Sequence, residues 1–198
     1  MEIETSQGTA EVTWDEVPEP AFVLVLTHGS NGGVDASDLL AVREVALGLG
    51  GTVARVLQPF RRAGRRAPGA PAKQDAAWLE VIEAVRGRAG DVPLVQGGRS
   101  NGARVACRTA REAEAAGVIA LAFPLVPPWN PAASRVDELR SAGVPVLVVS
   151  GDKDQFGVPA PADAAEVVVL PGERHDLDRN PAAVGAAAEP WLRRWMKG

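Results

Sequence analysis

The chain has 198 residues, and its 21 basic and 25 acidic side chains leave a formal net charge of −4. The single cysteine, Cys107, excludes an intrachain disulfide and a zinc site that needs two thiolates from this chain. The mild acidity and the absence of tyrosine argue against a nucleic-acid partner, which needs positive charge and stacking side chains. Only His28 and His175 could supply an imidazole base.

The length fits a single domain spanning residues 1–198. The first 14 residues are polar and acidic, so we expect no signal peptide. The longest apolar run, residues 118–126, is interrupted by Pro124 and is far shorter than the roughly 20 residues that cross a bilayer. These features predict a cytoplasmic protein that does not associate with a membrane.

The predicted elements begin with a hairpin formed by residues 3–5 and 10–14. Residues 21–27 form a continuous apolar run, which is typical of a strand buried on both faces. Residues 37–49 have apolar side chains at helical spacing, and Ser37 is the predicted N-cap. The later predicted strands are residues 52–57, 92–96, 118–122, 144–150 and 165–170, and the later predicted helices are residues 73–88, 101–116, part of 131–142, and 182–196.

This alternation predicts the α/β class: one doubly wound, mostly parallel sheet flanked by helices. Ligands of such sheets bind outside the carboxyl ends of the strands, so the loops that follow the strands should share one functional edge. Only about 20 residues separate the strands that end at Ala122 and begin at Val144. That is too short for a cap domain, and we therefore expect an open site.

The loop after the strand at residues 92–96 contains Gly98-Arg99-Ser100-Asn101-Gly102, a G-x-S-x-G pattern between a strand and a helix. In this context a serine stands on a strained turn that exposes its hydroxyl. The flanking positions must be small, and the N–H groups of the following helix face developing negative charge. A tight turn without chemistry has the same pattern, so the interpretation depends on the other loops.

Two of those loops carry Asp154 and His175, each after a predicted strand. The chain order Ser100, Asp154, His175 is the order of the triad in an α/β-hydrolase. A serine hydroxyl is a weak nucleophile that needs a base, and the base needs a carboxylate to fix its tautomer. The alternatives are an ordinary surface-loop histidine and a metal site that includes Asp152, which lacks a fourth ligand.

The strand at residues 21–27 leads into His28-Gly29-Ser30-Asn31-Gly32-Gly33. We predict that the backbone N–H groups of Ser30 and Asn101 bind an oxyanion, because small residues let the backbone approach the substrate. His28 is then a structural brace for this loop. Neither glycine-rich loop matches a dinucleotide or phosphate-binding pattern, so we expect no cofactor. Because Asp152, Asp154 and His175 lack a fourth ligand, we also expect no metal.

Five segments, LTHGSNGG, GGRSNGAR, FPLVPPWNP, SGDKDQFG and GERHDL, resemble small lidless α/β-hydrolases from about residue 21 to 195. The chain is most similar to the testis-expressed and NSL-complex hydrolase-like group, relatives of the dienelactone hydrolases. The resemblance implies Ser100 as nucleophile, Asp154 rather than Asp152 as the acid, and His175 as base. It leaves the substrate open. Because some members act as scaffolds, it also implies an alternative, a non-catalytic interaction module on the same fold.

Residues 61–66 hold four arginines, among them Arg61 and Arg62, in a loop on the same edge as Ser100. With Arg99 beside the serine, they suggest a basic rim that attracts an anionic acyl substrate. A solvated run of charges is the alternative interpretation.

Phe123 and Trp129 could form the walls of an acyl pocket, although such residues more often pack a core. The sequence as a whole predicts a serine hydrolase that cleaves a small-molecule ester or thioester through an acyl-enzyme. We expect a monomer or a homodimer.

Overall fold

The computed structural model describes residues 1–196, in which one eight-stranded sheet has the order β1-β2-β4-β3-β5-β6-β7-β8. The hairpin of β1 (Glu2–Thr5) and β2 (Gly8–Asp15) is antiparallel, and β2 also pairs antiparallel with β4. All later pairings are parallel. The parallel strands are β3 (Phe22–Thr27), β4 (Gly51–Leu57), β5 (Leu94–Arg99), β6 (Gly117–Leu121), β7 (Val146–Gly151) and β8 (Glu166–Leu170). The predicted mostly parallel α/β sheet is confirmed.

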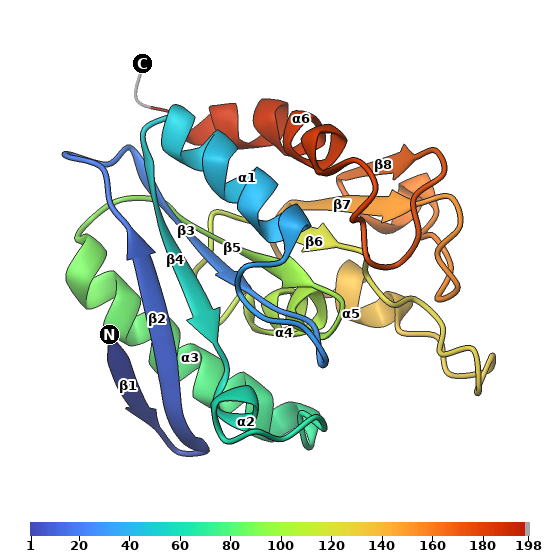
Figure 1. The fold of residues 1–198 in the computed structure, drawn as a ribbon, viewed down its shortest axis with the longest axis horizontal. Helices are drawn as coiled ribbons and strands as arrows, with labels where there is room; N and C mark the ends of the chain where they lie inside the picture. The colour runs from blue at the N-terminus through green and yellow to red at the C-terminus, as the bar shows by residue number, and fades with distance from the viewer. Residues whose placement is uncertain (197–198) are drawn as a thin grey trace.

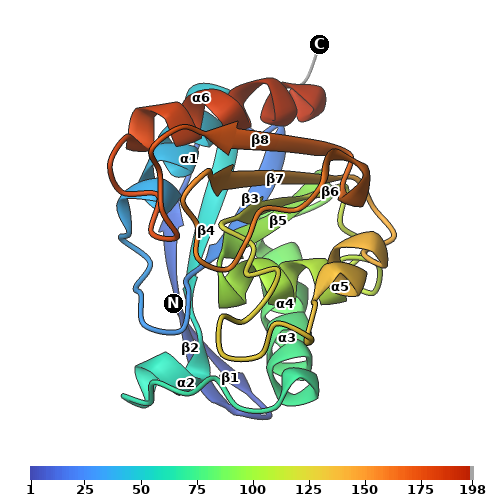
Figure 2. The same cartoon turned by 90° about the vertical axis from the view of Figure 1, so that its right-hand side faces the viewer.

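Helices cover both faces of this sheet (Figures 1 and 2). The pair α1 and α6 packs on one face, and α3 with α4 packs on the other. The helical segments are α1 (Ser37–Gly48), α2 (Pro59–Arg62), α3 (Pro71–Ala89), α4 (Asn101–Thr109), α5 (Val136–Arg140) and α6 (Pro181–Leu192), with 3-10 turns η1 (Pro161–Asp163) and η2 (Arg193–Trp195). Among residues 1–196, no helix combines the length and apolarity that crossing a bilayer requires.

The central strand β3 has an almost continuously apolar sequence because it is buried on both faces of the sheet. Phe22, Leu24 and Leu26 contribute to the core beneath α1 and α6, whereas Val23 and Val25 contribute to the core beneath α3 and α4. All six residues of the strand are buried. A strand with a hydrophobic layer on each side has no polar alternation to show.

Three sequence predictions about element ends need correction. Ser37 is the first residue of α1, and the N-cap is Ala36, which has no capping side chain. The strand predicted at residues 92–96 is β5, which begins at Leu94 and continues to Arg99, directly before Ser100. The helix predicted at residues 101–116 ends at Thr109.

The neighbouring helix α3 binds the turn that follows α4. Arg86 of α3 donates from Nη2 to the carbonyl oxygens of Ala113 (2.6 Å) and Glu114 (2.8 Å). Glu114 has a positive φ of 48°, which no continuing α-helix permits. The positive φ stops the helix from continuing through Glu114, and Arg86 binds the carbonyls of this turn, a contact that the local sequence does not reveal.

Candidate active site

Three side chains from loops at the carboxyl edge of the sheet form a chain of hydrogen bonds. Ser100 Oγ donates to His175 Nε2 (2.8 Å), and His175 Nδ1 donates to Asp154 Oδ2 (2.8 Å). Ser100 follows β5, Asp154 follows β7 and His175 follows β8. The parallel order of these strands thus brings together residues that are 75 and 21 positions apart in the chain.

Ser100 stands on a strained turn between β5 and α4. Its φ is 54° and its ψ is −112°, a conformation that non-glycine residues rarely adopt. A Cβ at Gly98 would lie 2.6 Å from the Thr27 carbonyl oxygen, and one at Gly102 would lie 2.8 Å from the His28 carbonyl oxygen. The two glycines are therefore required because the turn packs directly against the end of β3.

Asp154 is oriented by a second bond and by an aromatic neighbour. Its side chain is fully buried, and its Oδ1 accepts the backbone N–H of Phe156 at 2.8 Å. The Phe156 ring packs against the imidazole of His175, with ring centroids 4.3 Å apart. The imidazole is thus held between a fixed carboxylate and an aromatic ring. Sequence reasoning missed Phe156, although its place two residues after Asp154 is a usable signal.

Buried Glu173 fixes the loop that carries His175. Its carboxylate accepts the backbone N–H groups of Asn180 (2.6 Å) and Arg179 (3.4 Å). A Cβ at Gly151 would lie 2.2 Å from the Glu173 carbonyl oxygen, so the loops after β7 and β8 are in close contact. This role is not apparent from the sequence, because a glutamate in a loop is usually exposed to solvent.

The second histidine, His28, binds only backbone groups. Its Nδ1 donates to the carbonyl oxygen of Gly29 at 2.8 Å, and its Nε2 accepts the N–H of Gln58 at 3.0 Å. Burial lowers the pKa of His28 to about 4, against the weaker opposing effect of the Gly29 bond. The imidazole is therefore neutral at pH 7, and it ties the loop after β3 to the end of β4, as a brace would.

A cavity of about 540 Å³ opens beside Ser100 and His175. The predicted oxyanion donors, Ser30 and Asn101, both line it, and within residues 1–196 neither of their backbone N–H groups is bonded to another residue. Asn101 is held by its side chain, whose Nδ2 donates to Gln74 Oε1 at 2.9 Å. Two N–H groups are thus available at the mouth of the serine turn.

Arg99 lines this cavity, but its charge is shared between two carboxylates. Its Nη1 lies 3.0 Å from Asp176 Oδ1, and its Nε lies 3.5 Å from Asp38 Oδ2. Burial raises the pKa of Asp38 to about 6, and the neighbouring Arg99 opposes that rise. Sequence reasoning missed Asp38, because it belongs to α1, which is distant from Arg99 in the sequence and meets it only in the folded structure.

Of the other residues predicted to contact substrate, one lines the cavity and three do not. Trp129 lines the cavity, is exposed, and meets Phe156 edge-on with centroids 6.1 Å apart. Arg61 donates from Nε to the Gly32 carbonyl oxygen at 3.3 Å and so supports the loop after β3. Arg62 pairs with Glu2 of β1, and Phe123 is fully buried in the core. Arg61, Arg62 and Phe123 therefore support the surrounding structure and do not line the cavity.

Comparisons with known proteins agree with this architecture. The structure resembles a lidless α/β serine hydrolase, XC6422 from Xanthomonas campestris (20% identity, TM-score 0.79, covering 100% of this chain and 94% of that one). It also resembles Est1E from Butyrivibrio proteoclasticus with ferulic acid bound (18% identity, TM-score 0.81, 98% of each chain). A dienelactone hydrolase from Anabaena variabilis is similar as well (14% identity, TM-score 0.78, 100% of this chain and 97% of that one).

These likenesses confirm the predicted fold without a cap domain. No curated protein matches the sequence. A family model described as an alpha/beta hydrolase domain matches residues 20–182, which is most of the chain. The chain therefore belongs to the alpha/beta hydrolase family.

Proposed function

We propose that the protein is a serine hydrolase that cleaves an ester or thioester. The observation that carries this proposal is the continuous hydrogen-bonded chain from Ser100 through His175 to Asp154, with the serine on a strained turn at the wall of an open cavity. Ser100 Oγ attacks the carbonyl carbon while His175 Nε2 takes its proton. Asp154 keeps the imidazole in the tautomer that can do so.

The oxyanion that forms is bound by the N–H groups of Ser30 and Asn101. Donors that are in place before the reaction stabilise the transition state without a cost of reorganisation. His175 then returns the proton to the leaving alcohol or thiol, leaving Ser100 acylated. Water, activated by the same imidazole, hydrolyses the acyl-enzyme and restores the serine.

The acyl part of the substrate would lie against Trp129 and Phe156, which face the cavity. Two relatives support an ester substrate: Est1E binds ferulic acid, the acid that a feruloyl ester releases, and the Anabaena relative is a dienelactone hydrolase, named for a cyclic ester. Both Arg99 and Arg135 line the cavity, but Arg135 is the better candidate for binding an anionic group, because Arg99 already pairs with Asp38 and Asp176, whereas no carboxylate within residues 1–196 forms an ion pair with Arg135. We further propose, on the five sequence motifs alone, a place in the testis-expressed and NSL-complex hydrolase-like group. A cytoplasmic location is a separate proposal.

A panel of short-chain p-nitrophenyl esters and acyl-CoA thioesters tests this function with the wild type and Ser100→Ala. We expect turnover of at least one class and a loss of roughly 10⁴-fold or more in the variant. If no substrate shows serine-dependent turnover, the non-catalytic interaction module is the better account. Comparing neutral and anionic esters over a range of salt concentrations tests the role of positive charge, and equal, salt-independent rates would exclude it.

A further inference from the structure

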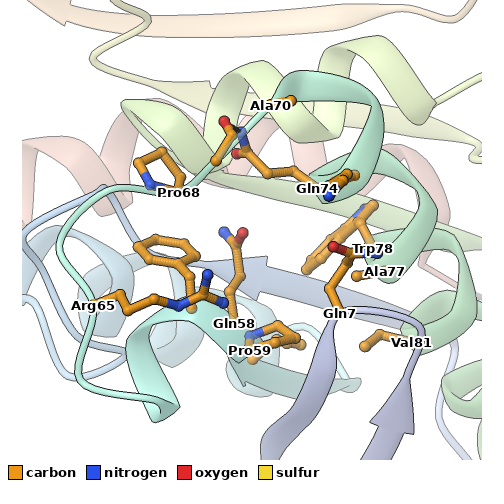
Figure 3. A pocket seen from close by; sticks show the side chains of 14 residues that line it. Gln7, Gln58, Pro59, Arg65, Pro68, Ala70, Gln74, Ala77, Trp78 and Val81 are labelled. Atoms are coloured by element: carbon orange, nitrogen blue, oxygen red, sulfur yellow. Dashed lines mark hydrogen bonds between the residues drawn. The ribbon is translucent and has the colours of Figure 1, made fainter.

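A second cavity lies outside the site of Ser100, between the chain that follows β4 and helix α3. Its volume is about 240 Å³. Figure 3 shows it bordered by α2 and the loop after it, by α3, and by the turn between β1 and β2. None of Ser100, Asp154 and His175 lines it, and Pro68 is the one residue on the walls of both cavities within residues 1–196.

The interior of this second cavity is mainly apolar. Its buried apolar lining residues are Val56, Pro59, Phe60, Ala77, Trp78 and Val81. The indole N–H of Trp78 is already bonded to Gln96 Oε1 at 2.8 Å, so the ring presents hydrocarbon to the cavity. An apolar cavity of about 150 Å³ accommodates a benzene ring, and this one is larger. It therefore suits an apolar body of roughly six to eight carbon atoms.

The rim has the opposite character. Arg65 and Lys73 line the cavity and are exposed, and no carboxylate within residues 1–196 forms an ion pair with either of them. The Arg65 side chain is directed across the cavity toward Gln58 (Figure 3). Two cations above an interior that is mainly apolar, with Gln58 and Gln74 as its buried polar residues, match a ligand with one anionic end. The start of α3 at Pro71 adds the positive end of a helix dipole to the same rim.

We propose that this cavity is a binding site for a free monocarboxylate, a medium-chain or aryl-alkyl acid. Its hydrocarbon body occupies the space beside Trp78 and Val81, and its carboxylate pairs with Arg65 and Lys73. The cavity contains none of the three reacting side chains, although its lining residue Gln74 bonds the side chain of Asn101. The site does not depend on the proposed hydrolase function.

Octanoate binding to Ser100→Ala, measured by isothermal titration calorimetry, tests the proposal. This variant cannot turn over an acyl group, so failure of the hydrolase proposal would not affect the result. We expect saturable binding, and we expect methyl octanoate, which lacks the charge, to bind more weakly. Each of Arg65→Gln and Lys73→Gln should weaken binding about two- to fivefold, the range for exposed charge pairs. Absence of binding, or equal binding of the neutral ester, would overturn the proposal.

The location of the ligand is tested separately, because octanoate could also enter the cavity beside Ser100. Ala77→Phe fills the second cavity and should reduce the affinity for octanoate more than about tenfold. Trp129→Ala alters the first cavity and should leave the affinity for octanoate unchanged. Circular dichroism shows whether Ala77→Phe folds.

A bromine-labelled octanoate gives a readout that does not require this variant. The bromine quenches a tryptophan that it contacts, and Trp78 and Trp129 lie in different cavities. Quenching that persists in Trp129→Phe supports the proposal, and quenching that disappears there places the ligand beside Ser100 and contradicts it.

Discussion

The two histidines of this protein lie in loops at the same edge of the sheet, and each makes two hydrogen bonds. His28 binds two backbone groups, is fully buried, and has a pKa lowered to about 4. His175 binds the side chains of Ser100 and Asp154 at the wall of an open cavity. The number of bonds is the same, but only His175 has a nucleophile on one nitrogen and a carboxylate on the other.

The difference shows what a general base requires beyond a histidine in the right region. A base must be able to carry a positive charge for part of the cycle, and Asp154 stabilises that charge. His28 has no carboxylate partner among the residues that the structure describes, and its burial opposes protonation. The predictions below separate the two imidazoles, from the largest expected effect to the smallest.

The sharpest contrast is between His175→Ala and a matched change at the brace, His28→Gln. Removing His175 should lower kcat by roughly 10⁴- to 10⁶-fold, because Ser100 loses its base. Steady-state kinetics on a p-nitrophenyl ester measure both variants. A folded His28→Gln protein that loses as much activity as His175→Ala would show that the division of roles is wrong.

The carboxylate is tested by Asp154→Asn, with Asp152→Asn as its control. Asparagine cannot fix the same tautomer, and we expect kcat to fall about 10⁴-fold. Asp152 instead accepts the Gly172 N–H at 2.7 Å near the surface, and its variant should change kcat less than about threefold. Similar losses in both would contradict the choice of Asp154 as the acid.

Two buried groups that do not bond each other, His28 and Asp38, should change the free energy of unfolding in opposite directions as pH changes. His28 has a pKa lowered to about 4, so its contribution is present above pH 6.5 and is lost as pH falls toward 4. Asp38 has a pKa raised to about 6, so its contribution is present below about pH 4 and is lost as pH rises toward 6. The two effects largely cancel between pH 4 and 6.

Asp38→Asn removes one side of this balance. The free energy of unfolding of the variant should then rise by about 3 kcal/mol between pH 4 and 6.5, on the order expected for the shift of His28 alone. Urea titrations at intervals across this range measure it. A pH dependence identical to that of the wild type would show that Asp38 is not the opposing group.

The smallest effect concerns the aromatic wall of the cavity. Trp129 is 76% exposed and touches Phe156 edge-on, so Trp129→Ala should raise KM for longer acyl chains only about two- to tenfold. kcat for an acetate ester should change little, because the bonds of His175 are intact. A large fall in kcat for acetate would mean that Trp129 helps to position the imidazole.

The sequence revealed those parts of the fold and site that depend on local pattern. The apolar run of β3 and the glycines around Ser100 each have a local physical cause, and the order of Ser100, Asp154 and His175 follows from a parallel sheet. The remaining features depend on tertiary contact. Arg86 of α3 binds the turn after α4, and Asp38 reaches Arg99 across the fold. Neither partner is a neighbour in the sequence.

Labelling with a fluorophosphonate probe, read by intact mass, tests the central claim most directly. A strained serine activated by His175 should take up one probe per chain in the wild type and none in Ser100→Ala. His175→Ala should label far more slowly, and His28→Gln should label at close to the wild-type rate. Labelling of the folded Ser100→Ala protein, or a wild-type protein that takes up no probe, would contradict the assignment of Ser100 as the nucleophile.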